Sequence, residues 1–162
     1  MTDGFDIQLK RRMKDIRRIV AMGIEANNKS VQMCADEGKR RVQDLLQTPG
    51  HYKKTAYSWG DHWSSAPGQP PALGTGHLLK SIVSAKTRDG NPASAYFGAT
   101  ARYAIPLEFG HKGPRPAAPR PFMRPVANDP SFRAYITMTV AQEWRRAILM
   151  GVAKTAKTSF KL

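Results

Sequence analysis

The sequence predicts an α+β domain in which a long N-terminal helix and a C-terminal helix pack on a small antiparallel sheet, with a long irregular loop and a proline-rich arm between them. Apolar residues recur every 3.6 positions over 9–45, turn-forming residues separate two strand-like segments near 90, and a helix start signal stands at 129–130. A length of 162 residues suits a single domain around one core. We therefore expect one domain over 1–162, divided into an N-terminal helical segment (1–47), an irregular loop (48–74), a hairpin core (75–110), a proline-rich arm (111–128), a C-terminal helix (129–153) and a basic tail (154–162).

The composition limits the class of protein. Lys and Arg number 26 against 12 Asp and Glu, a net charge of +14, and residues 111–162 carry +8 of it. A field of this sign favours an acidic or polyanionic partner. A hydrophobic share of 41% excludes a wholly disordered chain, and no apolar run reaches the roughly 20 residues of a spanning helix, so we expect no membrane partner. Cys34 is the single cysteine and the N-terminus lacks a signal-peptide pattern, which favours an intracellular or phage-like protein over a secreted one.

The N-terminal helix is predicted by an apolar stripe with the period of a straight α-helix. Asp6 is its expected N-cap, and Pro49 and Gly50 end it. Polar and glycine interruptions leave room for a kink or a break near 23–28. The stripe consists of Leu9, Met13, Ile16, Val20, Ile24, Asn27, Val31, Cys34, Gly38, Val42 and Leu45.

The middle of the chain predicts a loop followed by a hairpin. Residues 48–74 are rich in proline, glycine and aromatic residues, and we expect only a short strand there, at Thr55–Trp59. Strands are expected at Ile82–Thr87 and Ala93–Ala99, because Arg88–Asn91 has the chemistry of a hairpin turn. A lone hairpin is marginally stable, so it must pack on the helices.

Two short helical turns are also expected. Thr75 can cap a turn that runs through Leu79, and Tyr103–Phe109 predicts a short helix that ends at Gly110. Pro106 limits the length of this second turn.

The last third of the chain predicts an arm and a helix. Residues 111–125 contain too many prolines for a helix and too few N–H donors for a central strand. Asp129 at the N-cap and Pro130 at the first helical position then start the last helix. Its expected buried stripe is Phe132, Ile136, Val140, Trp144 and Ala147 or Ile148.

No catalytic, cofactor-binding or metal-binding site is predicted. The middle of the chain offers only three carboxylates: Asp89 belongs to the hairpin turn, Asp61 suits a loop cap, and Glu108 stands in an apolar setting. We expect Glu108 to pair with an arginine or with backbone donors. No two histidines have the spacing of a metal-ligand pair, the four being His51, His62, His77 and His111.

Basic residues crowd at the start of the first helix and at the end of the chain. They are Lys10, Arg11, Arg12, Lys14, Arg17 and Arg18, followed by Lys154, Lys157 and Lys161. Three interpretations stay open for the first group: contact with DNA phosphate, contact with an acidic neighbour subunit, or a solvated face. Farther along the helix, Asp36–Arg40 and Glu37–Arg41 are expected to form supporting pairs.

Three blocks, at 65–82, 103–110 and 120–126, resemble in order the tail-completion, or head–tail joining, family (neck, minor tail component) of long-tailed double-stranded DNA phages. That family carries P-G-x-P-P with T-G-x-L-x-x-S-I, then Y-A-x-x-x-E-F-G, then P-A-x-P-F-x-R-P before a C-terminal helix. The matching residues are Pro67, Gly68, Pro70, Pro71, Thr75, Gly76, Leu78, Ser81 and Ile82, then Tyr103, Ala104, Glu108, Phe109 and Gly110, then Pro121, Phe122, Arg124 and Pro125. The aromatic stretch 48–64 and Pro106 depart from the pattern. We expect the matched residues to serve mainly the fold, with Leu78, Ile82, Phe109 and Phe122 buried against the helices.

The resemblance implies a structural virion protein of the phage neck, assembled in the host cytoplasm, and no enzyme or cofactor. Its members form a ring, commonly sixfold, between the head connector or stopper and the tail terminator or tail tube, so the implied partners are copies of the chain and these proteins. Non-specific contact with genomic DNA in the lumen fits the basic residues. The expected subunit or ring contacts are Trp59, Trp63, Arg115, Arg120, Phe122 and Met123. The alternative is a basic protein that grips duplex backbone without sequence specificity.

Overall fold

The structure is a computed structural model that describes residues 3–48, 52–57, 60–90, 92–113 and 116–159, without the side chains of 3–6, 52–57, 60–64 and 154–159. It confirms the α+β class and the order of helix, hairpin and helix. The elements are α1 (Asp3–Gln47), β1 (Tyr52–Tyr57), β2 (Gly60–Ser65), α2 (His77–Lys80), β3 (Ile82–Arg88), β4 (Ser94–Ala99), α3 (Ala104–Phe109), α4 (Arg124–Asn128) and α5 (Pro130–Ser159).

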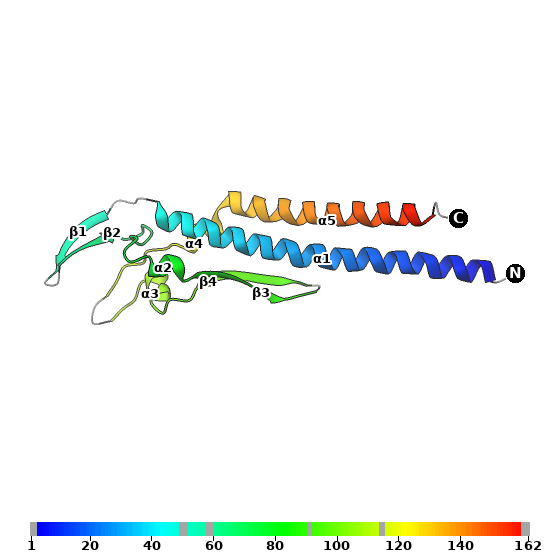
Figure 1. The fold of residues 1–162 in the computed structure, drawn as a ribbon. Coiled ribbons are helices and arrows are strands. Elements are labelled where there is room, and N and C mark those ends of the chain that lie inside the picture. The colour runs from blue at the N-terminus through cyan, green and yellow to red at the C-terminus, as the bar shows by residue number, and fades with distance from the viewer. Residues whose placement is uncertain (1–2, 49–51, 58–59, 91, 114–115, 160–162) are drawn as a thin grey trace.

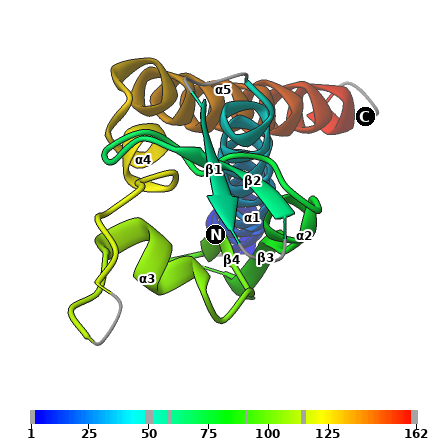
Figure 2. The same cartoon turned by 90° about the vertical axis from the view of Figure 1, so that its left-hand side faces the viewer.

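The long helix α1 lies in the middle of the molecule, between α5 on one side and the β3–β4 hairpin on the other (Figure 1). The helices α1 and α5 run antiparallel, so both termini lie at one end of the elongated molecule, and the β1–β2 hairpin lies at the other end (Figures 1 and 2). The sheet is therefore covered mainly by α1. The start of α5 still reaches it, because Phe132 packs edge-on against Phe97 of β4 with ring centroids 5.7 Å apart.

The helix α1 is unbroken over 45 residues, about 68 Å at 1.5 Å per residue. The N-cap prediction is wrong, because the helix already begins at Asp3 and Asp6 lies inside it. No break occurs near 23–28. Gly23 in that stretch and Gly38 farther along the helix allow close packing instead: a Cβ on Gly23 would lie 2.7 Å from the ring of Trp144, and one on Gly38 would lie 2.6 Å from the ring of Phe97.

Residues 48–74 form a hairpin followed by a loop, which corrects the prediction of an irregular segment with one short strand. The strands β1 and β2 pair antiparallel from Tyr52 opposite Ser65 to Tyr57 opposite Gly60. Tyr52, Thr55 and Tyr57 in β1 and Trp63 in β2 favour extended pairing, while the prolines and glycines of the loop are concentrated in 66–74. The proline and glycine content of 48–74 as a whole therefore masked the strand-forming residues in its first part.

The second hairpin is confirmed. Ile82 of β3 pairs with Ala99 of β4, and a bulge lies between Lys86 and Arg88. Gly90 in the connecting turn has a φ of 107°, a conformation that favours glycine.

The short turns and the arm differ in detail from the predictions. Gly76, with φ 73°, is the N-cap of α2, and Thr75 only accepts a long hydrogen bond of 3.4 Å from the His77 N–H. The arm contains the helix α4, which a proline-rich segment can form because Pro125 lies in its first turn, where no intrahelical N–H is needed. Pro106 lies in the first turn of α3 for the same reason.

The C-terminal helix begins as predicted and ends later. The Asp129 carboxylate accepts the Ser131 N–H at 2.9 Å, which is the capping bond of α5. The helix continues through Ser159, so residues 154–159 are helical and the prediction of a basic tail from 154 is wrong there. Lysine and alanine, both strong helix formers, supply three of its six residues.

The core lies where the second half of α1 meets the hairpin, α3, α4 and the start of α5. Phe122, at 1% exposure, is its largest fully buried side chain. The buried apolar cluster consists of Val42, Leu46, Ile82, Ala101, Ala104, Phe122, Val126 and Phe132.

Candidate functional site: the motif cluster and the two-helix arm

A buried carboxylate joins the second and third sequence blocks. Glu108 of α3 is 5% exposed, and its Oε2 accepts the N–H of Phe122 at 2.8 Å and of Met123 at 3.0 Å. Its Oε1 accepts the N–H of Arg124 at 2.9 Å. These donors stand at the start of α4, so the carboxylate satisfies N–H groups that the helix itself cannot. The expected pairing of Glu108 with backbone donors is confirmed.

The arm is bonded back onto the domain rather than extended. His111 and Ala117 exchange two backbone hydrogen bonds of 3.0 and 3.1 Å, and the Arg120 N–H donates to the Leu107 carbonyl at 2.7 Å. Gly110 allows this return, because its φ is 73° and a Cβ there would lie 2.7 Å from the Ala117 oxygen.

The first block is held by the same arm. The Gly68 N–H donates to the Pro119 carbonyl at 2.9 Å, and Arg120 Nε donates to the Ser65 carbonyl at 3.1 Å. All three blocks therefore meet at residues 119–124. The matched residues fall into buried positions (Pro71, Ser81, Ile82, Ala104, Glu108 and Phe122), half-buried positions (Pro70, Gly76, Leu78, Gly110 and Pro121) and exposed positions (Pro67, Gly68, Thr75, Tyr103, Phe109, Arg124 and Pro125).

One face of α3 exposes large apolar side chains. The helix turns Ala104 and Glu108 inward, so Ile105 and Phe109, one position later, point outward with 70% and 62% exposure. The prediction that Phe109 is buried is wrong; its ring lies under the Arg124 guanidinium, 4.7 Å from the ring centroid. The inward position of Glu108 was the signal that could have placed Phe109 outside.

A cavity of about 400 Å³ adjoins this face, between β4, α3 and α4. Its lining includes Phe97, Ile105, Phe109 and Met123. An exposed apolar surface of this kind is typical of a protein-interaction site. We call the surface formed by Ile105, Phe109 and the cavity the α3 face.

The residues predicted to contact other subunits lie in different parts of the structure. Phe122 is buried in the core and cannot touch a neighbour in this conformation, and Arg120 is occupied with the Ser65 carbonyl. Met123 lines the cavity of the α3 face. Trp59 and Arg115 lie outside the described residues, and Trp63 is described only as part of strand β2.

The apolar stripe of α1 is covered over its second half only. The hairpin ends at Gly90, whose N–H donates to the Asn28 side chain at 2.8 Å. Before that point the stripe is exposed at Leu9, Met13, Ile16 and Val20, so the prediction that these residues pack inside the domain is wrong. Figure 1 shows α1 continuing well beyond the tip of the hairpin.

The buried residues of α5 also differ from those predicted. Phe132 and Ala147 are buried, Ile136 and Val140 half-buried, and Trp144 and Ile148 exposed. The residues that face α1 most closely are small or polar. Thr139, Glu143 and Gly151 are buried there, and a Cβ on Gly151 would lie 3.3 Å from Ile19.

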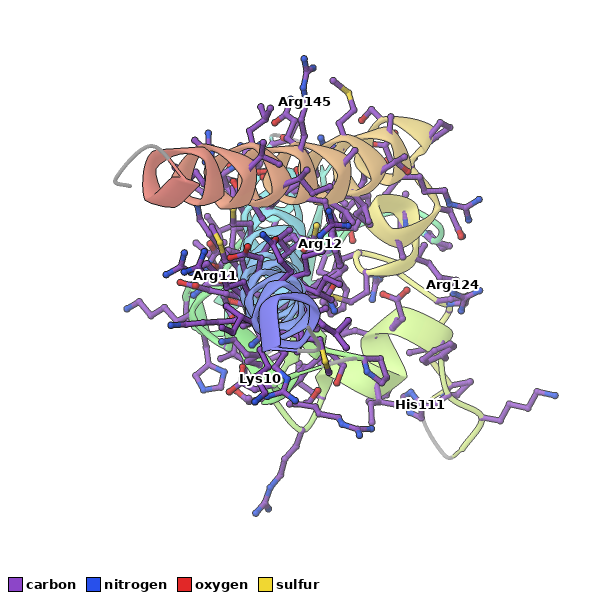
Figure 3. The ribbon with its side chains drawn as sticks, turned by 90° about the vertical axis from the view of Figure 1, so that its right-hand side faces the viewer. Lys10, Arg11, Arg12, His111, Arg124 and Arg145 are labelled. Atoms are coloured by element: carbon purple, nitrogen blue, oxygen red, sulfur yellow. The ribbon has the colours of Figure 1, made fainter. Side chains whose placement is uncertain are left out.

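The basic residues near the start of α1 form no ion pair with any described residue. All six, Lys10, Arg11, Arg12, Lys14, Arg17 and Arg18, are exposed. Figure 3 shows Lys10, Arg11 and Arg12 spread around the N-terminal end of the helix. The side chains of Lys154 and Lys157 and the whole of Lys161 lie outside the description.

The carboxylates in the second half of α1 bind groups within the domain. Glu37 binds Arg40 and Arg41 at 2.8 and 2.7 Å, which confirms the Glu37–Arg41 pair, and the hydrogen bond from Arg40 leads in lowering the pKa of Glu37 to about 2. The predicted Asp36–Arg40 pair is wrong, because Asp36 accepts from Gln32 and Ser84 instead.

The described part of the chain contains no group of three or more His, Cys, Asp or Glu side chains placed to hold a metal ion. None of its described helices combines the length and apolarity needed to cross a bilayer. No protein-family model, no curated protein and no solved structure matches the chain.

Proposed function

We propose that the chain is a structural virion protein of the phage neck, which forms a ring, completes the tail and joins it to the head connector, with DNA passing through the lumen. The observation that carries the proposal is the meeting of the three sequence blocks at residues 119–124, where Glu108 and the arm bond them into one unit. In a family of structural proteins, the shared sequence blocks are expected to stabilise a common fold rather than to form a catalytic site.

Ring formation needs two different surfaces that fit each other and close on themselves. The α3 face supplies one of them, because Ile105 and Phe109 project beside a cavity large enough to receive apolar side chains. The arm that supports this face is already bonded to the domain, so docking costs less conformational entropy than ordering a free loop. In this account the protein acts by binding copies of itself and adjoining neck or tail proteins, without catalysis.

The exposed basic face of α1 favours a second candidate, a protein that grips duplex backbone without sequence specificity. Its side chains are free of ion pairs with described residues. This candidate predicts tight binding of duplex DNA by the monomer and a steep loss of affinity as salt rises.

Native mass spectrometry in moderate salt, with and without a short duplex, separates the two candidates. The neck proposal predicts closed oligomers at high concentration and weak DNA binding. Ile105→Glu with Phe109→Glu should abolish the oligomers, whereas Met138→Glu with Leu149→Glu, an equal change on the outer face of α5, should leave them intact. A monomer that binds duplex tightly at every concentration would contradict the proposal.

A further inference from the structure

The parts of α1 and α5 that extend beyond the tip of the β3–β4 hairpin form a two-helix arm, which is separate from the proline-rich arm. This two-helix arm carries an apolar strip that nothing in the described chain covers. Trp144 of α5 packs on Gly23 of α1, which fixes how the two helices face each other. From Gly23 toward the N-terminus, Val20, Ile16, Met13 and Leu9 follow at steps of three and four residues. They therefore continue the side of α1 on which Gly23 lies, and each is about half exposed.

The strip extends onto α5. Ile148 follows Trp144 by four residues and so lies on the same side of α5, alongside the exposed part of α1 because the helices are antiparallel (Figure 1). We define the arm strip as Leu9, Met13, Ile16, Val20 and Ile148.

The charge around the arm strip is of one sign. Lys10 and Arg17 border it on α1, and Arg145 precedes Ile148 by three residues on α5. Over residues 7–24 the sequence contains six basic residues and one acidic residue, Asp15. Figure 3 shows Arg145 pointing outward from α5 and Lys10 outward from α1.

We propose that the arm strip is the docking face for an acidic protein partner, a helix or groove whose apolar surface is edged by aspartate and glutamate. Charge complementarity argues against a second copy at this face, because two such strips in contact would bring their basic borders together. The phosphates of duplex DNA could pair with the basic residues at the border, but DNA offers no apolar surface to cover the apolar residues. The identification of the partner as an adjoining neck or tail protein rests on the proposed function.

The test uses a fluorescent synthetic helix of about three heptads with leucine at a and d and glutamate at e and g. Its control has lysine at e and g; like charges at these positions keep both peptides from pairing with themselves. Anisotropy titrations of the full chain should show binding of the glutamate peptide at least about tenfold tighter than the lysine peptide, and weaker as salt rises.

Two double variants with the same loss of net charge separate the strip from the overall field. Ile16→Glu with Val20→Glu should weaken the glutamate peptide at least about tenfold, since it removes half-exposed apolar contact and adds like charge. Arg11→Gln with Arg18→Gln, on the side of α1 away from the strip, should leave most of the affinity. Ile16→Ala with Val20→Ala repeats the test without new charge, and circular dichroism confirms that each variant is folded.

Several results would overturn the proposal. They are equal binding of the two peptides, binding that survives Ile16→Glu with Val20→Glu, or strip-dependent binding of phosphatidylglycerol vesicles or of a short duplex in place of the glutamate peptide. Ring formation is measured separately. If the chain forms rings but does not bind the peptide, only the docking-face proposal is refuted. If it binds the peptide but forms no rings, the proposed function is refuted and the docking face stands.

Discussion

Replacing Glu108 by glutamine tests whether the carboxylate holds the sequence blocks together. The carboxylate accepts three backbone N–H groups at 2.8 to 3.0 Å in a site with 5% exposure. An amide of the same size has one acceptor oxygen, so its NH₂ group must face at least one of these donors. Water has little access to replace the missing acceptor.

The magnitude follows from three contributions. One donor left without an acceptor costs about 1–3 kcal/mol, and two bonds that change from charge-assisted to neutral lose about 1 kcal/mol each. Burying an amide costs less than burying a charge, which offsets part of the loss. We therefore expect Glu108→Gln to lower the free energy of unfolding by about 2–4 kcal/mol, a large fraction of the about 5–15 kcal/mol typical of a domain.

Urea unfolding followed by circular dichroism at 222 nm measures this change. The matched control is Glu25→Gln, because Glu25 is exposed on α1 and the substitution should change stability by less than about 0.5 kcal/mol. A loss below about 0.5 kcal/mol in Glu108→Gln, with an unchanged m-value, would refute the idea that this carboxylate organises the arm.

Further predictions concern packing and pH. Gly38→Ala should lower the midpoint of thermal unfolding, because the new Cβ would lie 2.6 Å from the Phe97 ring, and overpacking of about 1–3 kcal/mol exceeds the gain of about 1 kcal/mol in helix propensity. Gly23→Ala should be close to neutral, since the partly exposed Trp144 ring can move away; equal midpoints for the two variants would contradict this account. Glu37 has a pKa lowered from 4.5 to about 2, so its contribution to stability is full above pH 4.5 and disappears as the pH falls to about 2. Denaturant titrations at stepped pH should show that Glu37→Gln loses this part of the acid transition, and an identical pH profile would contradict it.

Periodicity and cap chemistry predicted the main elements. The 3.6-residue spacing predicted α1, the turn at 88–91 predicted the β3–β4 hairpin, and Asp129 with Pro130 predicted the start of α5. Each of these signals acts over a few neighbouring residues, so no tertiary contact is needed to interpret it.

The errors arise where tertiary contacts decide. An apolar stripe shows which face of a helix is apolar but not how far a partner element extends, so the end of the hairpin at Gly90 left Ile16 and Val20 exposed. The glycine in the stretch 23–28 favoured a kink or a break, whereas Gly23 gives room to the Trp144 ring in a continuous helix. The β1–β2 hairpin was concealed by the prolines and glycines that follow it.

The sequence allowed the role of Glu108 in the candidate site to be predicted, but it did not predict which surfaces the site exposes. The pairing of Glu108 followed from a carboxylate in an apolar setting, but its three donors lie more than ten residues away. The α3 face depends on which side of a six-residue helix points inward, and such a helix is too short to show a period.

We propose that this protein works by assembling copies of itself through apolar surfaces, and cryo-electron microscopy of the concentrated full chain tests this most directly. We expect class averages of closed rings with Ile105 and Phe109 at the contact between neighbouring subunits. Single elongated particles at every concentration and salt, or copies joined only through the basic end of α1, would contradict it.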